Sequence, residues 1–177
     1  MTQLTLEEGD WFCFRVNSEL VYGIIARMPR QNSSSFLGFF FLGEENSDVS
    51  LFFPEDAILV GDVSTLSIKN NTWRRIGCSA DWEQKRETWS PPVFLHPNGI
   101  RARWRLEKLN DELQWSGEYV TLSDPIQGFA SGSMGSGYVE KILAKAIAKN
   151  FKRILWIDTA SEKSGEAQLK EQLSPKT

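Results

Sequence analysis

The Gly/Ser-rich segment 128–137 has the residue types best suited to binding a small molecule. Its GSMGSG run (residues 132–137) precedes a helical pattern, and backbone N–H groups at a helix N-terminus can bind phosphate. Asp158 follows about 20 residues later, where a dinucleotide-binding fold places a carboxylate. However, the glycines are spaced GxxGxG rather than GxGxxG, and the preceding predicted strand ends near Leu122. We therefore predict a connecting loop, with a small-ligand or nucleotide site as an alternative.

Three arginines form a second candidate site. Arg101, Arg103 and Arg105 lie on one face of a predicted strand, 100–106, whose apolar residues share the other face. They could bind the phosphates of a nucleic acid, but the sequence pI of about 5.3 is low for a nucleic-acid-binding domain. We favour a solvated strand face paired with acidic neighbours, and keep a nucleic-acid-binding β-barrel as the other alternative.

The sequence offers little for catalysis or metal binding. His96 is the only histidine and lies in a predicted turn, 96–99, with no nucleophile motif beside it. The two cysteines, Cys13 and Cys78, are too few for a disulfide framework, which favours reduced thiols and leaves one bridge open. No metal-ligand spacing joins these residues. We predict a protein that is not an enzyme and binds no cofactor or metal.

Charge is distributed unevenly along the chain. The net charge is −3, but residues 1–62 contain ten acidic and three basic residues, and the remainder is net positive. Six carboxylates of the first part fall in predicted turns, where loops on a rigid sheet are well placed to contact a partner. These candidate partner-binding residues are Glu44, Glu45, Asp48, Glu55, Asp56 and Asp62. They indicate binding to a basic protein.

A β-hairpin is predicted to begin the scaffold that carries these loops. Residues 9–28 form two apolar alternating runs around a polar turn at 17–19, the pattern of half-buried strands. Strands are further predicted at 36–42, 51–53, 57–60, 73–78, 93–95, 100–106, 113–122 and 154–157, with an ambiguous charged segment at 81–89. Short strands separated by turn residues are typical of a barrel or sandwich.

One helix is predicted, at about 138–150, where Val139, Ile142, Leu143, Ala146 and Ile147 follow helical spacing. The predicted fold is thus α+β and mainly β: an antiparallel barrel or strongly curved sheet with one C-terminal amphipathic helix. We expect one domain over 1–160 and a polar tail over 161–177. Neither a secretory signal nor a membrane-spanning run is recognised, which indicates a cytoplasmic protein without membrane contact.

Several scaffold residues resemble those of a known family. Gly9-Asp10 with Trp11-Phe12, Tyr22-Gly23 before Ile24-Ile25, and Trp73 with Ile76-Gly77 resemble bacterial immunity family twenty-six, as does the Trp-rich approach to Pro91-Pro92. The resemblance covers residues 9–94 and supplies no functional residues. It implies a β-rich cytoplasmic protein of a polymorphic toxin system, which protects the bacterium by binding a toxin.

The sequence therefore predicts a non-catalytic immunity protein. We expect it to bind its cognate toxin, a basic protein, through the acidic turns. It would neutralise the toxin by occluding the active site or a surface nearby.

Overall fold

The computed structural model describes residues 5–29, 34–98, 103–120, 127–130, 132–150 and 156–157, which form two β-sheets and several helices. The larger sheet has six strands in the order β10-β4-β3-β2-β1-β5. These are β1 (Asp10–Val16), β2 (Glu19–Arg27), β3 (Ser35–Gly43), β4 (Leu59–Ser64), β5 (Arg74–Cys78) and β10 (Ser133–Met134). Neighbouring strands are antiparallel except β10 and β4, which run parallel.

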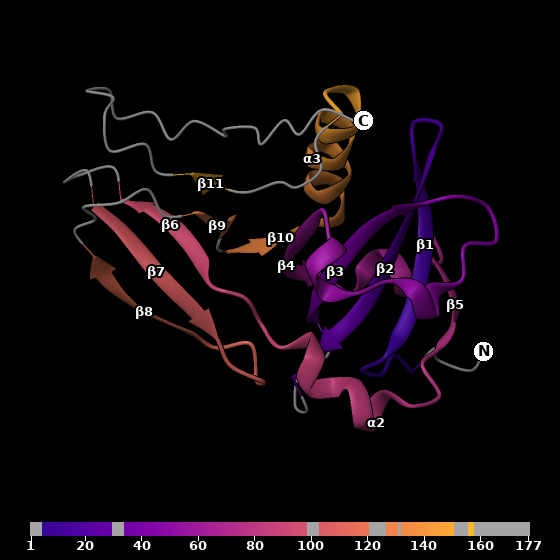
Figure 1. Ribbon diagram of the computed structural model, residues 1–177, viewed down its shortest axis with the longest axis horizontal. Coiled ribbons are helices and arrows are strands. Elements are labelled where there is room, and N and C mark those ends of the chain that lie inside the picture. Colours follow the sequence, from indigo (N-terminus) through magenta and orange to yellow (C-terminus); the bar gives the residue numbers. More distant parts are fainter. Residues whose placement is uncertain are drawn as a thin grey trace.

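The smaller sheet lies beside the larger one (Figure 1) and has five strands in the order β11-β9-β6-β7-β8. Its strands are β6 (Phe94–Asn98), β7 (Arg103–Leu109), β8 (Trp115–Val120), β9 (Gln127–Ala130) and β11 (Trp156–Ile157). The α-helices are α1 (Leu66–Lys69), α2 (Trp82–Lys85) and α3 (Ser136–Ala148), and the 3₁₀ helices are η1 (Val49–Leu51), η2 (Pro54–Asp56) and η3 (Arg86–Trp89).

The prediction of an α+β, mainly β protein with a C-terminal helix is confirmed, whereas the prediction of a barrel is wrong. Among the strands described, the larger sheet ends at β5 on one side and at β10 on the other. The chain leaves this sheet after β5 and builds a second sheet instead of closing the first one (Figure 1). Within the residues that the structure describes, no helix is long and apolar enough to cross a bilayer.

Strands β1 to β4 of the six-stranded sheet are buried on both faces, which corrects the prediction of half-buried strands over residues 9–28. On one face, Phe12, Val21 and Phe40 pack in a cluster with Val139 and Leu143 of α3. The residues that alternate with them belong to a cluster on the other face: Trp11, Tyr22 and Phe41, with Trp82 and Trp89 from α2 and η3, and Phe94 and Leu109 from the smaller sheet. Covering both faces explains why these strands are aromatic on each side.

Trp73 connects the sheet to α3. Its side chain is fully buried and stacks on Phe12 and Phe14, with ring centroids 5.4 Å and 4.3 Å away. Its indole N–H donates to Glu140 Oε1 of α3 at 2.8 Å. One side chain thus joins the aromatic cluster and fixes the position of the helix.

Gly23 of β2 is required by close packing, which gives a testable prediction. It pairs with Phe12 across the sheet, and a Cβ at this position would overlap the Phe12 ring. The ring is held against Trp73, so we expect Gly23→Ala to lower the free energy of unfolding by about 1–3 kcal/mol in urea denaturation. Gly61→Ala is the matched control, because its Cβ would meet only the flexible end of Met134. Equal losses in the two variants would contradict this account.

Several element boundaries differ from those predicted. Residues 51–53 do not form a strand, because the chain turns through η1 and η2 around them. The strand predicted at 57–60 corresponds to β4, which continues to Ser64 instead of ending at Gly61-Asp62. It continues because Asp62 pairs with Leu37 of β3 inside the sheet. The predicted helix begins earlier, at Ser136, and the charged segment 81–89 is helical.

Candidate partner-binding surface

The connection between β3 and β4, residues 44–58, carries five of the six predicted partner-binding carboxylates, and we call it the acidic connection. It contains five acidic residues and no basic ones. Glu44, Glu45, Asp48, Glu55 and Asp56 are all exposed. The structure therefore places these five residues on one continuous segment of chain, as a negatively charged surface.

Hydrogen bonds hold the start of the acidic connection in one conformation. The Tyr22 hydroxyl donates to the Glu44 carbonyl at 2.8 Å, and the Glu44 N–H donates to Ser47 Oγ at 2.9 Å. Asn46 adopts a left-handed conformation, φ +67°, in which asparagine is among the more readily accepted residues. The carboxylates that follow therefore stand on an ordered turn.

Asp48 also has a local structural role. It is the N-cap of η1, and its Oδ1 accepts bonds from the Ser50 N–H at 2.9 Å and the Ser50 hydroxyl at 2.7 Å. The hydroxyl bond first and the N–H bond second lower the pKa of Asp48 below its ordinary value. Asp48 is therefore charged at neutral pH and is fixed in direction.

Phe52 attaches the middle of the acidic connection to the core. Its ring stacks on Phe41 with a centroid distance of 4.9 Å and contacts Trp11 and Tyr22 at 6.0 Å and 5.5 Å. The neighbours on either side, Leu51 and Phe53, remain 68% and 51% exposed. Two large apolar side chains are therefore exposed among the carboxylates, on either side of one packed aromatic ring.

Two of the six predicted carboxylates differ from the others. Glu45 accepts from Arg15 at 2.7 Å, in an ion pair whose two side chains are both more than half exposed. Asp62 lies in β4 rather than in a turn, and it is only 3% exposed. The expectation that Asp62 belongs to an exposed turn is wrong, because its carboxylate is buried and accepts a hydrogen bond from the Ser133 hydroxyl.

The Gly/Ser segment 128–137 is not simply a loop. Gln127–Ala130 forms β9 and Ser133–Met134 forms β10, so much of it is paired within the two sheets. The Ser133 hydroxyl donates a hydrogen bond to the buried side chain of Asp62, so this hydroxyl is already engaged and is not available to a phosphate. Asp158, the other residue considered for nucleotide binding, lies outside the described residues.

The structure describes only part of the three-arginine candidate site, Arg101, Arg103 and Arg105. Arg105 in β7 pairs with Glu107 of the same strand at 3.2 Å, which agrees with a strand face that neutralises its own charges. Arg101 and the side chain of Arg103 lie outside the described part of the chain. His96 lies in strand β6. The prediction that it lies in a turn is therefore wrong.

Cys13 and Cys78 are free thiols, one buried and one exposed. Partial desolvation of the Cys78 thiol first, and the nearby Asp10 carboxylate second, raise the pKa of Cys78, which makes it a weaker nucleophile at neutral pH. Across the described ranges, no three His, Cys, Asp or Glu side chains are grouped so that they could hold a metal ion.

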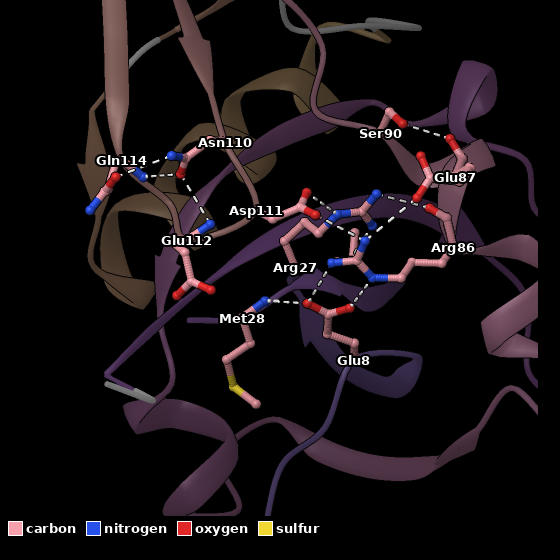
Figure 2. A network of polar contacts seen from close by, with 11 residues as sticks. Glu8, Arg27, Met28, Arg86, Glu87, Ser90, Asn110, Asp111, Glu112 and Gln114 are labelled. Atoms are coloured by element: carbon pink, nitrogen blue, oxygen red, sulfur yellow. Dashed lines mark hydrogen bonds and ion pairs between the residues drawn. The ribbon is translucent and has the colours of Figure 1, made fainter. Parts of the chain in front are cut away.

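A network of polar contacts joins the two sheets (Figure 2). Arg27 of β2 is 1% exposed and donates from Nε to Asp111 Oδ1, in the turn between β7 and β8, at 2.8 Å. Arg86 of η3 donates to Asp111 Oδ2 at 3.0 Å and to Glu8 Oε2 at 2.7 Å. Glu8 also accepts from the Met28 N–H at 3.1 Å.

Neighbouring side chains within this network account for the pKa shifts of its charged groups. The hydrogen bonds that Arg86 donates, first to Glu8 and then to Asp111, outweigh partial burial and raise the pKa of Arg86. At Asp111, partial burial acts to raise the pKa, but bonds from Arg27 and Arg86 outweigh it and lower the pKa below its ordinary value. Each charged group has an opposite charge beside it. We therefore assign a structural role to the network, which holds the smaller sheet against the larger one.

Comparison with known proteins found no relative of this chain. No family model, no curated protein and no solved structure matches the chain.

Leu51 and Phe53 are the surface residues that sequence reasoning missed. The sequence pattern predicted a short strand over residues 51–53. A signal was present in the sequence, since Pro54 follows directly and acidic residues flank the run on both sides. Such a short run between turn residues cannot continue as a central strand.

Proposed function

We propose that this protein is a non-catalytic immunity protein, which binds a basic bacterial toxin in the cytoplasm and neutralises it. The observation that carries the proposal is the acidic connection, with five exposed carboxylates and no basic residue on one ordered segment. A surface of one charge attracts an oppositely charged partner and orients it before contact. The residues within 9–94 that resemble immunity family twenty-six motivate the same function, although no family model matches the chain.

The proposed mode of action is occlusion. A toxin that acts on nucleic acid presents a basic surface to phosphates, and exposed carboxylates on a rigid turn can occupy that surface instead. The bonds of Tyr22, Ser47 and Ser50 fix the turn before the partner arrives, so little conformational entropy is lost on binding.

The proposal is tested by retrieving the partner with matched variants of the full chain. The test variant is Glu44→Gln, Asp48→Asn, Glu55→Gln and Asp56→Asn; Glu45 is left because it is paired with Arg15. The control removes the same number of exposed carboxylates elsewhere, through Glu7→Gln, Glu83→Gln, Glu87→Gln and Glu112→Gln. Immobilised wild type and control should retain one basic toxin from a nuclease-treated lysate of the source organism, and the test variant should not.

The retained protein must also be neutralised. Purified and added to growing cells or to its substrate, it should be toxic alone and inactive with one equivalent of wild-type chain. A retained protein with no toxic activity, or equal retention by the test variant and the control, would count against the proposal.

A further inference from the structure

The acidic connection presents an apolar pair at its centre. Leu51 is 68% exposed and Phe53 is 51% exposed. Burying such side chains against a partner stabilises a complex, less the cost of ordering the groups that make it. Single exposed apolar residues are common on proteins, so the arrangement of these two decides whether they are informative.

Both side chains are turned away from the core. Phe52 and Phe53 are both extended, at φ −85°, ψ 133° and φ −117°, ψ 152°. Successive side chains of extended backbone point to opposite sides. Phe52 packs inward on Phe41, so Phe53 is turned outward. Leu51 is the last residue of η1 and is the more exposed of the two.

The pair is also held in place. Phe52 is packed on three aromatic rings just between its members. On one side Asp48 caps η1, and on the other Pro54 begins η2 with its restricted φ. Two exposed side chains on such a segment lose little freedom when a partner covers them.

We infer that Leu51 and Phe53 are the apolar anchors of the partner complex, and that the partner surface is an apolar recess rimmed by Lys and Arg. Asp48 precedes the pair, and Glu55 and Asp56 follow it, so a basic rim would match the carboxylates around both anchors. A second copy of the chain does not fit, because it would bring two sets of carboxylates together. This inference rests on the proposed function and names the chemistry of the partner.

The two parts of the surface have separable effects on binding kinetics. Carboxylates around the edge act mainly on the association rate and its salt dependence, whereas buried apolar anchors act mainly on the dissociation rate. Changing the anchors should therefore shorten the lifetime of the complex and leave the association rate nearly unchanged.

The test uses defined probes with the full chain. An amphipathic helical peptide of lysine and leucine represents a basic-rimmed apolar surface, and polylysine represents charge alone. Amide NMR shifts map where each binds, and titration gives the affinity. The anchor variant is Leu51→Ser with Phe53→Ser; Leu66→Ser is the matched control, because Leu66 is 59% exposed on α1, outside the acidic connection.

We expect the amphipathic peptide to shift residues 51–53 and to bind the anchor variant about tenfold more weakly. Polylysine should bind the wild type, the anchor variant and the control equally. If the amphipathic peptide binds the anchor variant as tightly as the control, or shifts only other residues, the anchor assignment is overturned.

The same titrations separate this failure from that of the proposed function. If the anchor variant is unaffected while the four-carboxylate variant loses both probes, charge-driven binding stands without the anchors. If the four-carboxylate variant also binds like its control, the acidic connection is not the binding surface and both proposals fail. Concentration-dependent dimerisation that the anchor variant abolishes would assign the pair to self-association and overturn the inference.

Discussion

Replacing Trp73 by alanine is expected to lower the free energy of unfolding by about 3–5 kcal/mol. The side chain is fully buried and stacks on Phe12 and Phe14, so its removal leaves a cavity between the six-stranded sheet and α3. It also leaves Glu140 of α3 without the indole N–H that it accepts at 2.8 Å. The measurement is urea denaturation followed by circular dichroism.

A second variant separates packing from hydrogen bonding. Trp73→Phe keeps an aromatic ring against Phe12 and Phe14 but removes the N–H donor. The lost hydrogen bond contributes about 1 kcal/mol, and the smaller ring adds a modest packing loss. Trp73→Phe should therefore be clearly more stable than Trp73→Ala. A loss below about 1 kcal/mol in Trp73→Ala would show that Trp73 does not join α3 to the sheet.

Replacing Asp111 by alanine is expected to lower the free energy of unfolding by about 2–3 kcal/mol at neutral pH. The change leaves the 1% exposed guanidinium of Arg27 without its carboxylate, and breaking a fully buried pair in this way costs roughly 3–5 kcal/mol. Asp111 itself is 56% exposed, so water screens the pair and the smaller figure applies. Denaturation with urea measures the difference.

The Asp111 contribution should depend on pH in one direction. Its pKa is lowered in the folded protein, so folding favours the charged form. The contribution is complete above the unfolded pKa of about 4 and is lost as the pH falls through the folded value. The stability difference between wild type and Asp111→Ala should therefore be constant from neutral pH to about pH 5 and shrink below about pH 4.

Asp81→Ala is the control for that prediction. Asp81 pairs with Lys85 at 2.8 Å, but both side chains are nearly half exposed, and water screens such a pair so that it contributes little to stability. If Asp81→Ala and Asp111→Ala were equally destabilising, the network around Arg27 would not hold the two sheets together.

Local patterns in the sequence predicted most of the elements correctly. Alternating apolar residues located β1 and β2, a short continuous apolar run located β3, and helical spacing located α3. Their arrangement was not predictable in the same way, because closure of a sheet depends on contacts between distant segments. The pairing of β4 with β10 joins residues 71 positions apart, such as Asp62 and Ser133. No local pattern around either residue predicts this pairing.

The candidate surface was likewise predicted in part. Five of six carboxylates are exposed, because acidic residues beside Asn, Ser and Pro mark turns well. Asp62 was misplaced because Gly61-Asp62 has the composition of a turn, whereas β4 continues through it. Leu51 and Phe53 were misread because their exposure follows from the packing of Phe52 on Phe41, a contact across the fold.

The central claim is that the exposed carboxylates of the acidic connection recruit a basic partner. The most direct measurement is the association rate of the purified partner as a function of ionic strength, with wild type, the four-carboxylate variant and its matched control. We predict that wild type and control associate fast at low salt and slow down steeply as salt is added, and that the four-carboxylate variant associates at least about tenfold more slowly with a flatter salt dependence. The same rate and the same salt dependence in all three proteins would contradict the account.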